Sequence, residues 1–254
     1  MRVQKVLAEL QDFYVLAVRS LVGIFRKPLY VRETVEQMDY AGAGSFVIVF
    51  LVSLFIGMAL SLSISTELAT MGLKMYTGKI VGIAIIREVG PVAIALSFAG
   101  RVGSGMASEI GSMVLGHQVD MLRVFGMDVV KKLVTPRVVS ATLMLPLLTV
   151  IGDAAALFGG YYISVFVSHQ SGSFYWSQLA AVMSFKNLFI GLAKPFLFGY
   201  LIAVISCYMG LATRGGARGL REATTAAVVL STIMILVANF ILIRLLFLVL
   251  GMDA

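Results

Sequence analysis

Charged residues interrupt several apolar segments that are otherwise long enough to cross a membrane, and Arg87, Glu88 and Asp153 are the ones whose chemistry is considered first. A charge in hydrocarbon is costly, so such residues are functional candidates by default. Arg87 and Glu88 are neighbours and cannot face each other on one helix, so each is expected to meet either a partner elsewhere or the water of the membrane interface. They could move ions or protons. Asp153 has no local counter-ion, which favours a hydrogen-bonded structural acid or a protonated acid over a proton relay.

The composition indicates that these charges belong to a protein embedded in a membrane. The 254 residues are 59% hydrophobic and only 13% charged, and the mean hydropathy is +0.97. Soluble globular chains carry about 25% charged residues. Because the chain has too few charged residues to cover the surface of a folded protein in water, we predict an integral membrane protein. The formal net charge of +7 is typical of cytoplasmic loops beside membrane helices and does not indicate nucleic-acid binding.

The sequence holds no pattern typical of catalysis or of a metal site. The single cysteine, Cys207, excludes an intramolecular disulfide, and the two histidines, His117 and His169, lie 52 residues apart. Gly72 and Gly78 resemble a phosphate-binding loop, but five residues separate them where four are needed. We therefore expect no catalytic residue, no metal ligand and no cofactor in this chain, which cannot hydrolyse ATP alone.

Five apolar segments are long enough to cross a bilayer as helices, which takes about 20 residues each. The predicted spans are residues 40–66, 80–115, 138–167, 187–213 and 223–250. Pro91 is expected to bend the second span, and residues 169–186 are expected to form a loop. Leu246, in the fifth span, is expected to face lipid. The predicted fold class is an all-α integral membrane protein with five transmembrane helices.

Residues 1–39 precede the first span and form the first predicted region. Apolar residues recur there at steps of three and four with charges on the other side, which predicts an amphipathic helix in the membrane interface. Pro28, after Arg26 and Lys27, is expected to end it, and residues 31–39 are a second surface helix or a linker. Thirteen Lys and Arg residues on one side against four on the other predict a cytoplasmic N-terminus.

Small residues form two adjacent rows in the second span. One row holds Ala99, Gly103, Ala107 and Gly111, and the other holds Gly100, Ser104, Ser108 and Ser112. Small residues at four-residue spacing let another helix backbone approach closely in a membrane. The rows therefore predict helix packing, either within the subunit or at the seam of a homodimer.

A polar segment at residues 117–137 is too long for a minimal turn. Its apolar residues recur with helical spacing, while polar side chains are free to contact a partner. The segment is either a surface helix on the lipid headgroups or a docking helix for a cytoplasmic protein, and its spacing alone favours neither.

Several ordered motifs together resemble one known family. They are REVGP at 87–91, FAGRVGS at 98–104, EIGSM at 109–113, LPLL at 145–148, GGARG at 215–219 and ATT at 223–225. These motifs resemble the core of the MlaE permease family, the membrane subunits of bacterial ABC transporters that move phospholipids between the inner and outer membranes and maintain outer-membrane lipid asymmetry. The resemblance runs from about residue 37 to the C-terminus.

The resemblance implies which residues bind lipid and which couple to an ATPase. In such permeases a lipid pocket lies at the dimer axis. Carried onto this chain, it would be lined by Leu60, Ile64, Glu67, Leu68 and Met71, with Arg87 and Glu88 close by. Coupling would run through Gln118, Asp120, Leu122, Arg123, Gly126 and Asp128. Residues 40–254 would be the permease domain.

The resemblance also implies partners and a location. It implies a homodimer in the bacterial inner membrane, two cytoplasmic ATPase subunits that bind ATP and magnesium, a periplasmic MCE-domain lipid-binding protein and a possible small cytoplasmic accessory subunit. Two other functions stay open: an ion-coupled carrier that uses Arg87, Glu88 and Asp153, and a membrane scaffold that transports nothing. Transport driven by a proton gradient without an ATPase would favour the carrier.

Overall fold

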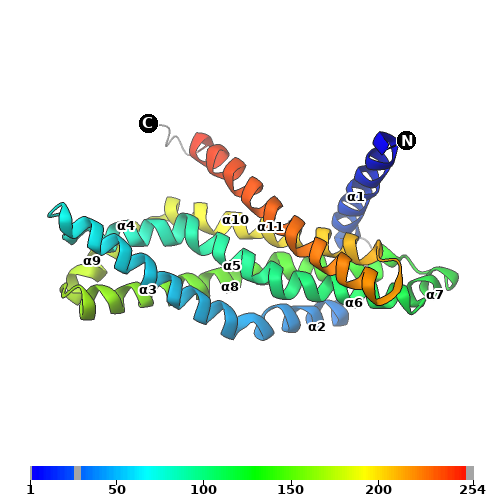
Figure 1. Cartoon of the computed structure of the whole chain (residues 1–254), viewed down its shortest axis with the longest axis horizontal. Helices are drawn as coiled ribbons and strands as arrows, with labels where there is room; N and C mark the ends of the chain where they lie inside the picture. The colour runs from blue at the N-terminus through cyan, green and yellow to red at the C-terminus, as the bar shows by residue number, and fades with distance from the viewer. Residues whose placement is uncertain (1, 26–29, 250–254) are drawn as a thin grey trace. The chain divides into compact units, whose positions relative to one another are not determined.

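The computed structural model describes residues 2–25 and 30–249, and all regular structure among them is helical (Figure 1). The α-helices are α1 (Arg2–Phe25), α2 (Val31–Ala41), α3 (Phe46–Thr70), α4 (Thr77–Ala84), α5 (Gly90–Phe98), α6 (Ser104–Leu115), α7 (Gln118–Val124), α8 (Thr135–Tyr162), α9 (Gly172–Val182), α10 (Phe185–Leu211) and α11 (Gly216–Val249). Short 3-10 turns are η1 (Ala43–Ser45) and η2 (Lys74–Tyr76), and π-helical turns are η3 (Ile85–Val89), η4 (Ala99–Gly103), η5 (Val130–Val134) and η6 (Ile163–Val167).

Five of these helical runs are long and apolar enough to cross a membrane, which confirms the predicted fold class. They are Val31–Thr70, Lys74–Leu115, Val130–Val167, Phe185–Leu211 and Gly216–Leu248. Residues 31–39, predicted as a surface helix or a linker, belong to the helix α2. The residues predicted to end the first helix, Arg26, Lys27 and Pro28, lie outside the described residues. The bilayer position of α1 stays a prediction.

Two sequence predictions need correction. Residues 169–186 are not simply a loop, because α9 occupies their centre. Tyr175 and Leu179 of α9 are fully buried against α4, so burial of apolar side chains stabilises a helix that the flanking serines and glycine concealed. Leu246 was expected to face lipid, but only 7% of it is exposed. Phe240, at 69%, is an exposed residue of the same helix.

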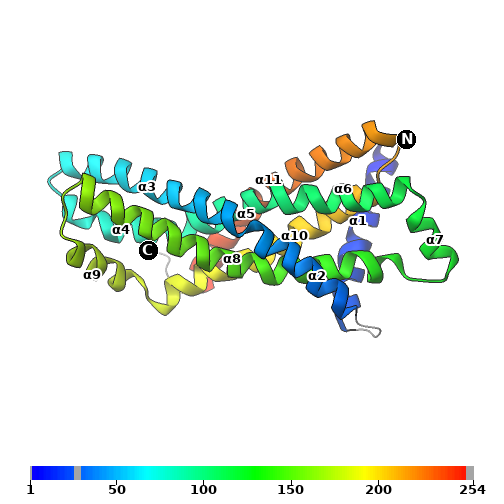
Figure 2. The same cartoon turned by 90° about the horizontal axis from the view of Figure 1, so that it is seen from below.

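The chain divides into two compact units. Unit 1 contains residues 1–44, 98–144 and 197–235, and unit 2 contains residues 45–97, 145–196 and 236–254. In unit 2, α3, α4 and α9 lie side by side, as both views show (Figures 1 and 2). Their shared core includes Val81 of α4 and Tyr175 of α9, with Leu60 of α3 packed against it. Burial raises the pKa of Tyr175 to about 12, so its phenol stays neutral and donates to the Leu157 carbonyl at 3.3 Å.

Close packing of α3 on α8 holds unit 2 together. The buried face of α3 is a row of mostly small residues: Val49, Ser53, Gly57, Ser61 and Ser65. The Ser61 hydroxyl donates to the Gly160 carbonyl at 3.0 Å, and the Ser168 hydroxyl donates to Ser65 at 2.9 Å. A Cβ on Gly57 would collide with the Ala156 backbone. Small side chains thus let the two backbones approach, and hydroxyl groups add hydrogen bonds across the contact.

Unit 1 uses the first of the two predicted small-residue rows. Ala99, Gly103, Ala107 and Gly111 are all buried. A Cβ on Gly103 would lie 3.0 Å from the Ser206 hydroxyl and 3.1 Å from the Ile202 side chain of α10. This row therefore packs within the subunit. In the second row Gly100 is exposed, and a Cβ there would meet nothing within 4 Å.

These two glycines give a matched pair of variants. Gly103→Leu is expected to push α10 away and to destabilise the fold by ~1–3 kcal/mol, the usual effect of overpacking. Gly100→Leu, three residues away in the same helix, is expected to leave the melting temperature of the purified protein unchanged. Equal melting of both variants and the original protein would show that the packing of Gly103 has been misread.

Candidate functional site

A network of charged and amide side chains lies within unit 2, in the middle of apolar helices. At its centre Lys194 of α10, whose side chain is fully buried, donates to the Glu88 carboxylate at 2.7 Å. The other Glu88 oxygen accepts from the Asn239 amide of α11 at 3.3 Å. The network therefore joins the second, fourth and fifth apolar helices of the chain.

The backbone around Pro91 explains why Lys194 lies there. Proline has no N–H, so Pro91 leaves the carbonyl of Arg87, four residues earlier, without its usual helical donor. The helix forms the π-helical turn η3 immediately before this point. The Lys194 ammonium donates to that Arg87 carbonyl at 2.7 Å. A backbone acceptor freed by proline is thus satisfied by a buried lysine, which explains the predicted irregularity at Pro91 physically.

Arg87 has partners of its own in the same unit. Its guanidinium donates to the Asn187 side-chain oxygen at 2.9 and 2.5 Å, and it lies 5.8 Å from the centre of the Phe247 ring. Asn187 in turn donates to the Val182 carbonyl at 2.6 Å, which fixes the orientation of its amide. Arg87 and Glu88 thus use different partners, as their adjacency in the sequence requires.

Asp153, the third predicted intramembrane charge, lies next to this network. A Cβ on Gly90 would collide with its carboxylate, so Gly90 is needed for α5 to lie against α8 at this level. The Oδ1 atom of Asp153 is buried and has no hydrogen-bond partner among residues 2–25 and 30–249. Lys194, Asn187 and Asn239, in contrast, were not recognised from the sequence, because each lies about 100 residues or more from its partner.

The predicted lipid-binding residues of α3 form one edge of the same unit. Leu60 and Ile64 are half-buried and pack against the core cluster that contains Ile85 and Leu157. Leu68 is half-buried, whereas Glu67 is exposed and Met71, just after the helix, is 67% exposed. The contacts of Arg87 and Glu88 described above run to α10 and α11, so they do not join these α3 residues directly.

The predicted coupling residues lie around α7 in unit 1, where Figure 2 shows this short helix beyond the end of α6. The side chains of Gln118, Asp120, Arg123 and Asp128 are exposed, and Asp120 pairs with Arg123 at 3.2 Å. The remaining predicted apolar residue, Leu122, packs instead against the buried cluster of Val119, Val129 and Leu133. Its role is therefore to hold α7 on the unit.

Two further predicted residues shape the turn after α7. Gly126 has a φ of +72°, which side-chain-bearing residues rarely adopt. Asp128 accepts the backbone N–H of Val130 at 2.9 Å, at the beginning of η5. Sequence reasoning missed the exposed apolar side chains of this tip: Met121 (60%), Val124 (85%) and Phe125 (73%). The sequence feature that could have revealed them is a group of three apolar residues outside the helical spacing of the apolar residues predicted for this segment.

Across residues 2–25 and 30–249, no group of three or more His, Cys, Asp or Glu side chains could hold a metal ion. Five apolar helices with an internal polar network define an all-α, multi-pass membrane protein. A family model described as Permease MlaE matches residues 34–245. The chain therefore belongs to the MlaE permease family, and the resemblance in its motifs is confirmed.

Curated relatives agree with this assignment. A probable ABC transporter permease protein of Rickettsia bellii is 34% identical over 235 residues, which cover 92% of this chain and 91% of that protein. A probable ABC transporter permease protein of Synechocystis is 36% identical, over 85% of this chain and 82% of its own length. The chloroplast protein named trigalactosyldiacylglycerol 1 of Arabidopsis thaliana is 33% identical, over 90% of this chain and 65% of its own length. The chain is a membrane permease subunit of the ABC transporter class.

Proposed function

We propose that this permease moves phospholipids between the inner and outer membranes of a bacterium and so helps to maintain outer-membrane lipid asymmetry. The observation that carries the proposal is the edge of α3, where half-buried Leu60, Ile64 and Leu68 follow one another at four-residue spacing and the exposed Glu67 precedes Leu68. An acyl chain needs an apolar wall and a headgroup needs a polar rim. The name of the Arabidopsis relative, which contains that of a glycolipid, favours a lipid substrate here.

The proposed transporter contains other subunits. In it, two copies of this chain form a dimer in the inner membrane, and two cytoplasmic ATPase subunits bind ATP and magnesium. A periplasmic MCE-domain protein exchanges lipid with the dimer, and a small accessory subunit is a further candidate partner. This chain contributes no catalytic residue. Its part is to bind the lipid on α3 and to transmit movement from the ATPase through α7.

Purification of the intact complex in detergent tests the substrate class and the partner class together. Mass spectrometry of proteins and retained lipids is expected to find an ATPase subunit and phospholipid in proportion to this chain. A complex that contains neither, or substrate flux that a proton gradient drives without ATP, would contradict the proposal and favour a carrier.

The exposed tip of α7 gives a separate prediction about the ATPase. Phe125→Glu and Asp120→Lys are expected to release the ATPase subunit or to uncouple hydrolysis from transport, because a charge in an apolar contact or a reversed charge at its rim weakens docking. Phe185→Glu is the matched control, since Phe185 is 84% exposed and lies in unit 2 at the start of α10. Co-purification of the ATPase with each variant measures the effect. Full retention and full transport by both α7 variants would contradict the assignment.

A further inference from the structure

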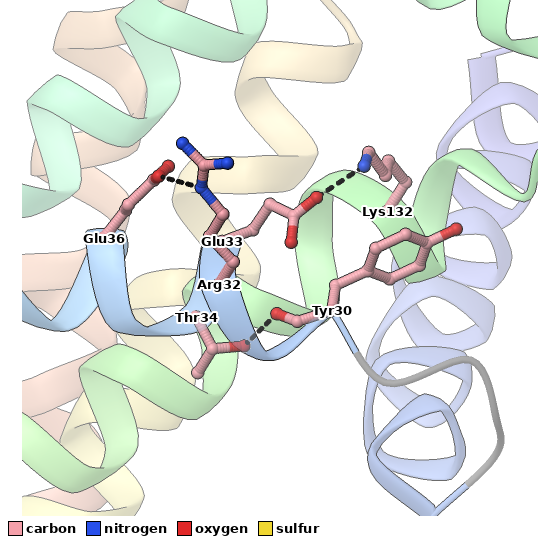
Figure 3. Close-up of polar contacts among 6 residues, drawn as sticks. All are labelled: Tyr30, Arg32, Glu33, Thr34, Glu36 and Lys132. Carbon is pink, nitrogen blue, oxygen red and sulfur yellow. Dashed lines mark hydrogen bonds and ion pairs between the residues drawn. The ribbon is translucent and has the colours of Figure 1, made fainter.

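An ion pair attaches the beginning of α2 to η5, the turn that follows α7 in unit 1 (Figure 3). The Lys132 ammonium donates to the Glu33 carboxylate at 2.5 Å and lies 4.4 Å from the centre of the Tyr30 ring. The Glu33 and Lys132 side chains are 35% and 28% exposed, so water and salt screen the pair only in part. The pair joins two elements whose residues lie 99 positions apart in the sequence.

A second ion pair of α2 has a different geometry. Arg32 donates to Glu36 at 3.0 Å, four residues further along the same helix, and both side chains are mostly exposed. Figure 3 shows that this pair stays within α2, whereas the Glu33 side chain points to Lys132. A pair at this spacing supports its own helix and nothing else. Of the two glutamates, Glu33 is therefore the one that ties α2 to another element.

A cavity between α2 and α8 gives the beginning of α2 room to move. It measures about 250 Å³, and its walls are mostly apolar side chains of α1, α2 and α8, among them Ile24, Val35 and Val139. Thr34 and Lys131, which are neighbours of the ion pair in the chain, also line it. Helices that pack closely leave little free volume between them. Because free volume is present here, the attachment of this end of α2 depends on the polar contact more than it would in a packed interface.

Packed side chains connect Lys132 to α7. Its neighbour in η5, Leu133, belongs to the buried cluster against which Leu122 of α7 packs. The Lys132 backbone N–H donates to the Asp128 carbonyl at 2.9 Å, so η5 and the turn before it form one hydrogen-bonded segment. A packed interior transmits strain instead of absorbing it. A displacement of α7 therefore reaches Lys132.

At its other end α2 leads into the helix that carries the proposed lipid-binding residues. The Tyr40 carbonyl, near the end of α2, accepts from the Arg101 guanidinium at 3.1 Å, and this guanidinium lies 5.1 Å from the centre of the Tyr40 ring. After α2 ends at Ala41, the chain continues through η1 into α3, which begins at Phe46. A displacement at Glu33 thus turns α2 about its Tyr40 end and passes along the chain to α3.

We propose that Glu33 and Lys132 are positioning residues of the transport cycle, which pass the movement of α7 to α2 and so to the lipid-binding residues of α3. This inference rests on the proposed function, in which α7 contacts the ATPase and α3 binds phospholipid. In this role neither residue contacts phospholipid or ATP. The ion pair makes lipid movement depend on ATP hydrolysis, so its loss separates the two rates and leaves the complex assembled.

The amount of phospholipid moved per ATP hydrolysed tests this role. The complete complex is placed in donor vesicles, and transfer of labelled phosphatidylglycerol to acceptor vesicles is measured together with ATP hydrolysis. Glu33→Gln and Lys132→Gln are each expected to lower the ratio about fivefold, the most that a partly exposed ion pair contributes. ATP hydrolysis, retention of the ATPase and the melting temperature should change little. Glu36→Gln, which breaks only the pair within α2, is the matched control and should transport like the original protein.

The double variant distinguishes a shared contact from two separate roles. Glu33→Gln combined with Lys132→Gln is expected to lower the ratio no further than either single variant, because both remove the same interaction. A double variant whose loss equals the product of the two single losses would overturn the inference. So would a fall in hydrolysis and transport by the same factor, since the pair would then merely stabilise unit 1.

The original complex separates this inference from the proposed function. If it hydrolyses ATP without moving phospholipid, the proposed function fails and the inference fails with it. If the original complex transports phospholipid and the Glu33 and Lys132 variants transport as much per ATP, the inference alone is overturned. An equal loss in Glu36→Gln would overturn it too, because any broken ion pair of α2 would then have the same effect.

Discussion

Lys194→Met is expected to be among the most damaging single substitutions in this chain. It removes the ammonium group that pairs with Glu88 and that satisfies the Arg87 carbonyl. Removing one partner of a buried ion pair costs about 3–5 kcal/mol, because the other charge stays behind. Glu88 retains 35% exposure, so we expect a loss near the lower end, about 3 kcal/mol. Melting of the purified protein and its yield from membranes measure the loss.

The Glu88 charge can be tested by a double variant. Lys194→Met combined with Glu88→Gln removes both charges and should recover part of the stability, because glutamine keeps a donor and an acceptor for Asn239. Lys186→Met is the control, since Lys186 lies exposed at the start of the same helix. If Lys194→Met melts like the control, the ion pair does not stabilise unit 2. If the double variant melts no higher than Lys194→Met alone, the loss of stability comes from the unsatisfied Arg87 carbonyl instead.

Hydropathy alone predicts the five spans, because a helix in lipid satisfies its backbone hydrogen bonds within its own segment. Such a helix can therefore be recognised without knowledge of the helices that it packs against. The irregular parts of the same helices were less visible. Beside the π-helical turn η3, the Arg87 carbonyl that Pro91 leaves without a helical donor is satisfied by Lys194, which lies more than 100 positions along the chain. A local pattern contains no information about such a contact.

Helix packing was predicted for one pair of helices and missed for another. The row through Gly103 was recognised from small residues at four-residue spacing. The row on α3 was overlooked, although Ser53, Gly57, Ser61 and Ser65 have the same four-residue spacing. Serine is also common at membrane-helix contacts, since its hydroxyl can bond across them. Applying the search for small-residue rows to the first span as well as to the second would have identified the buried face of α3 from the sequence.

The polar network and the α3 edge together limit how the transport pocket can be tested. Arg87 and Glu88 were expected at its rim, yet both side chains already bond to partners on α10 and α11. Substituting them would therefore damage unit 2 as well as any lipid site. Leu60 and Ile64 present a milder form of the same difficulty, because each packs against the core cluster. Leu68, near the end of α3, is half-buried and lies outside that cluster.

Leu60→Asp and Leu68→Asp are expected to abolish lipid retention and transport if α3 forms the pocket wall. A charge in an apolar site costs about 3 kcal/mol or more, which corresponds to about 100-fold weaker lipid binding. Leu60→Asp should also lower the melting temperature through its core contact, whereas Leu68→Asp should lose lipid with little change in melting. Leu62→Asp is the control on the same helix, since Leu62 is 45% exposed and precedes the Leu68 level by about two turns.

Photoreactive side chains distinguish lipid bound in the pocket from lipid of the bulk bilayer, and they introduce no charge. Those at Leu60 and Leu68 are expected to capture lipid that stays bound through detergent washing. Phe240, which is 69% exposed on α11, should give only background capture, and it replaces Leu246 as the reference because Leu246 is buried. Equal capture at all three positions, together with full transport by Leu68→Asp, would place the transported lipid elsewhere. Full transport by that variant would itself show that unit 2 is folded.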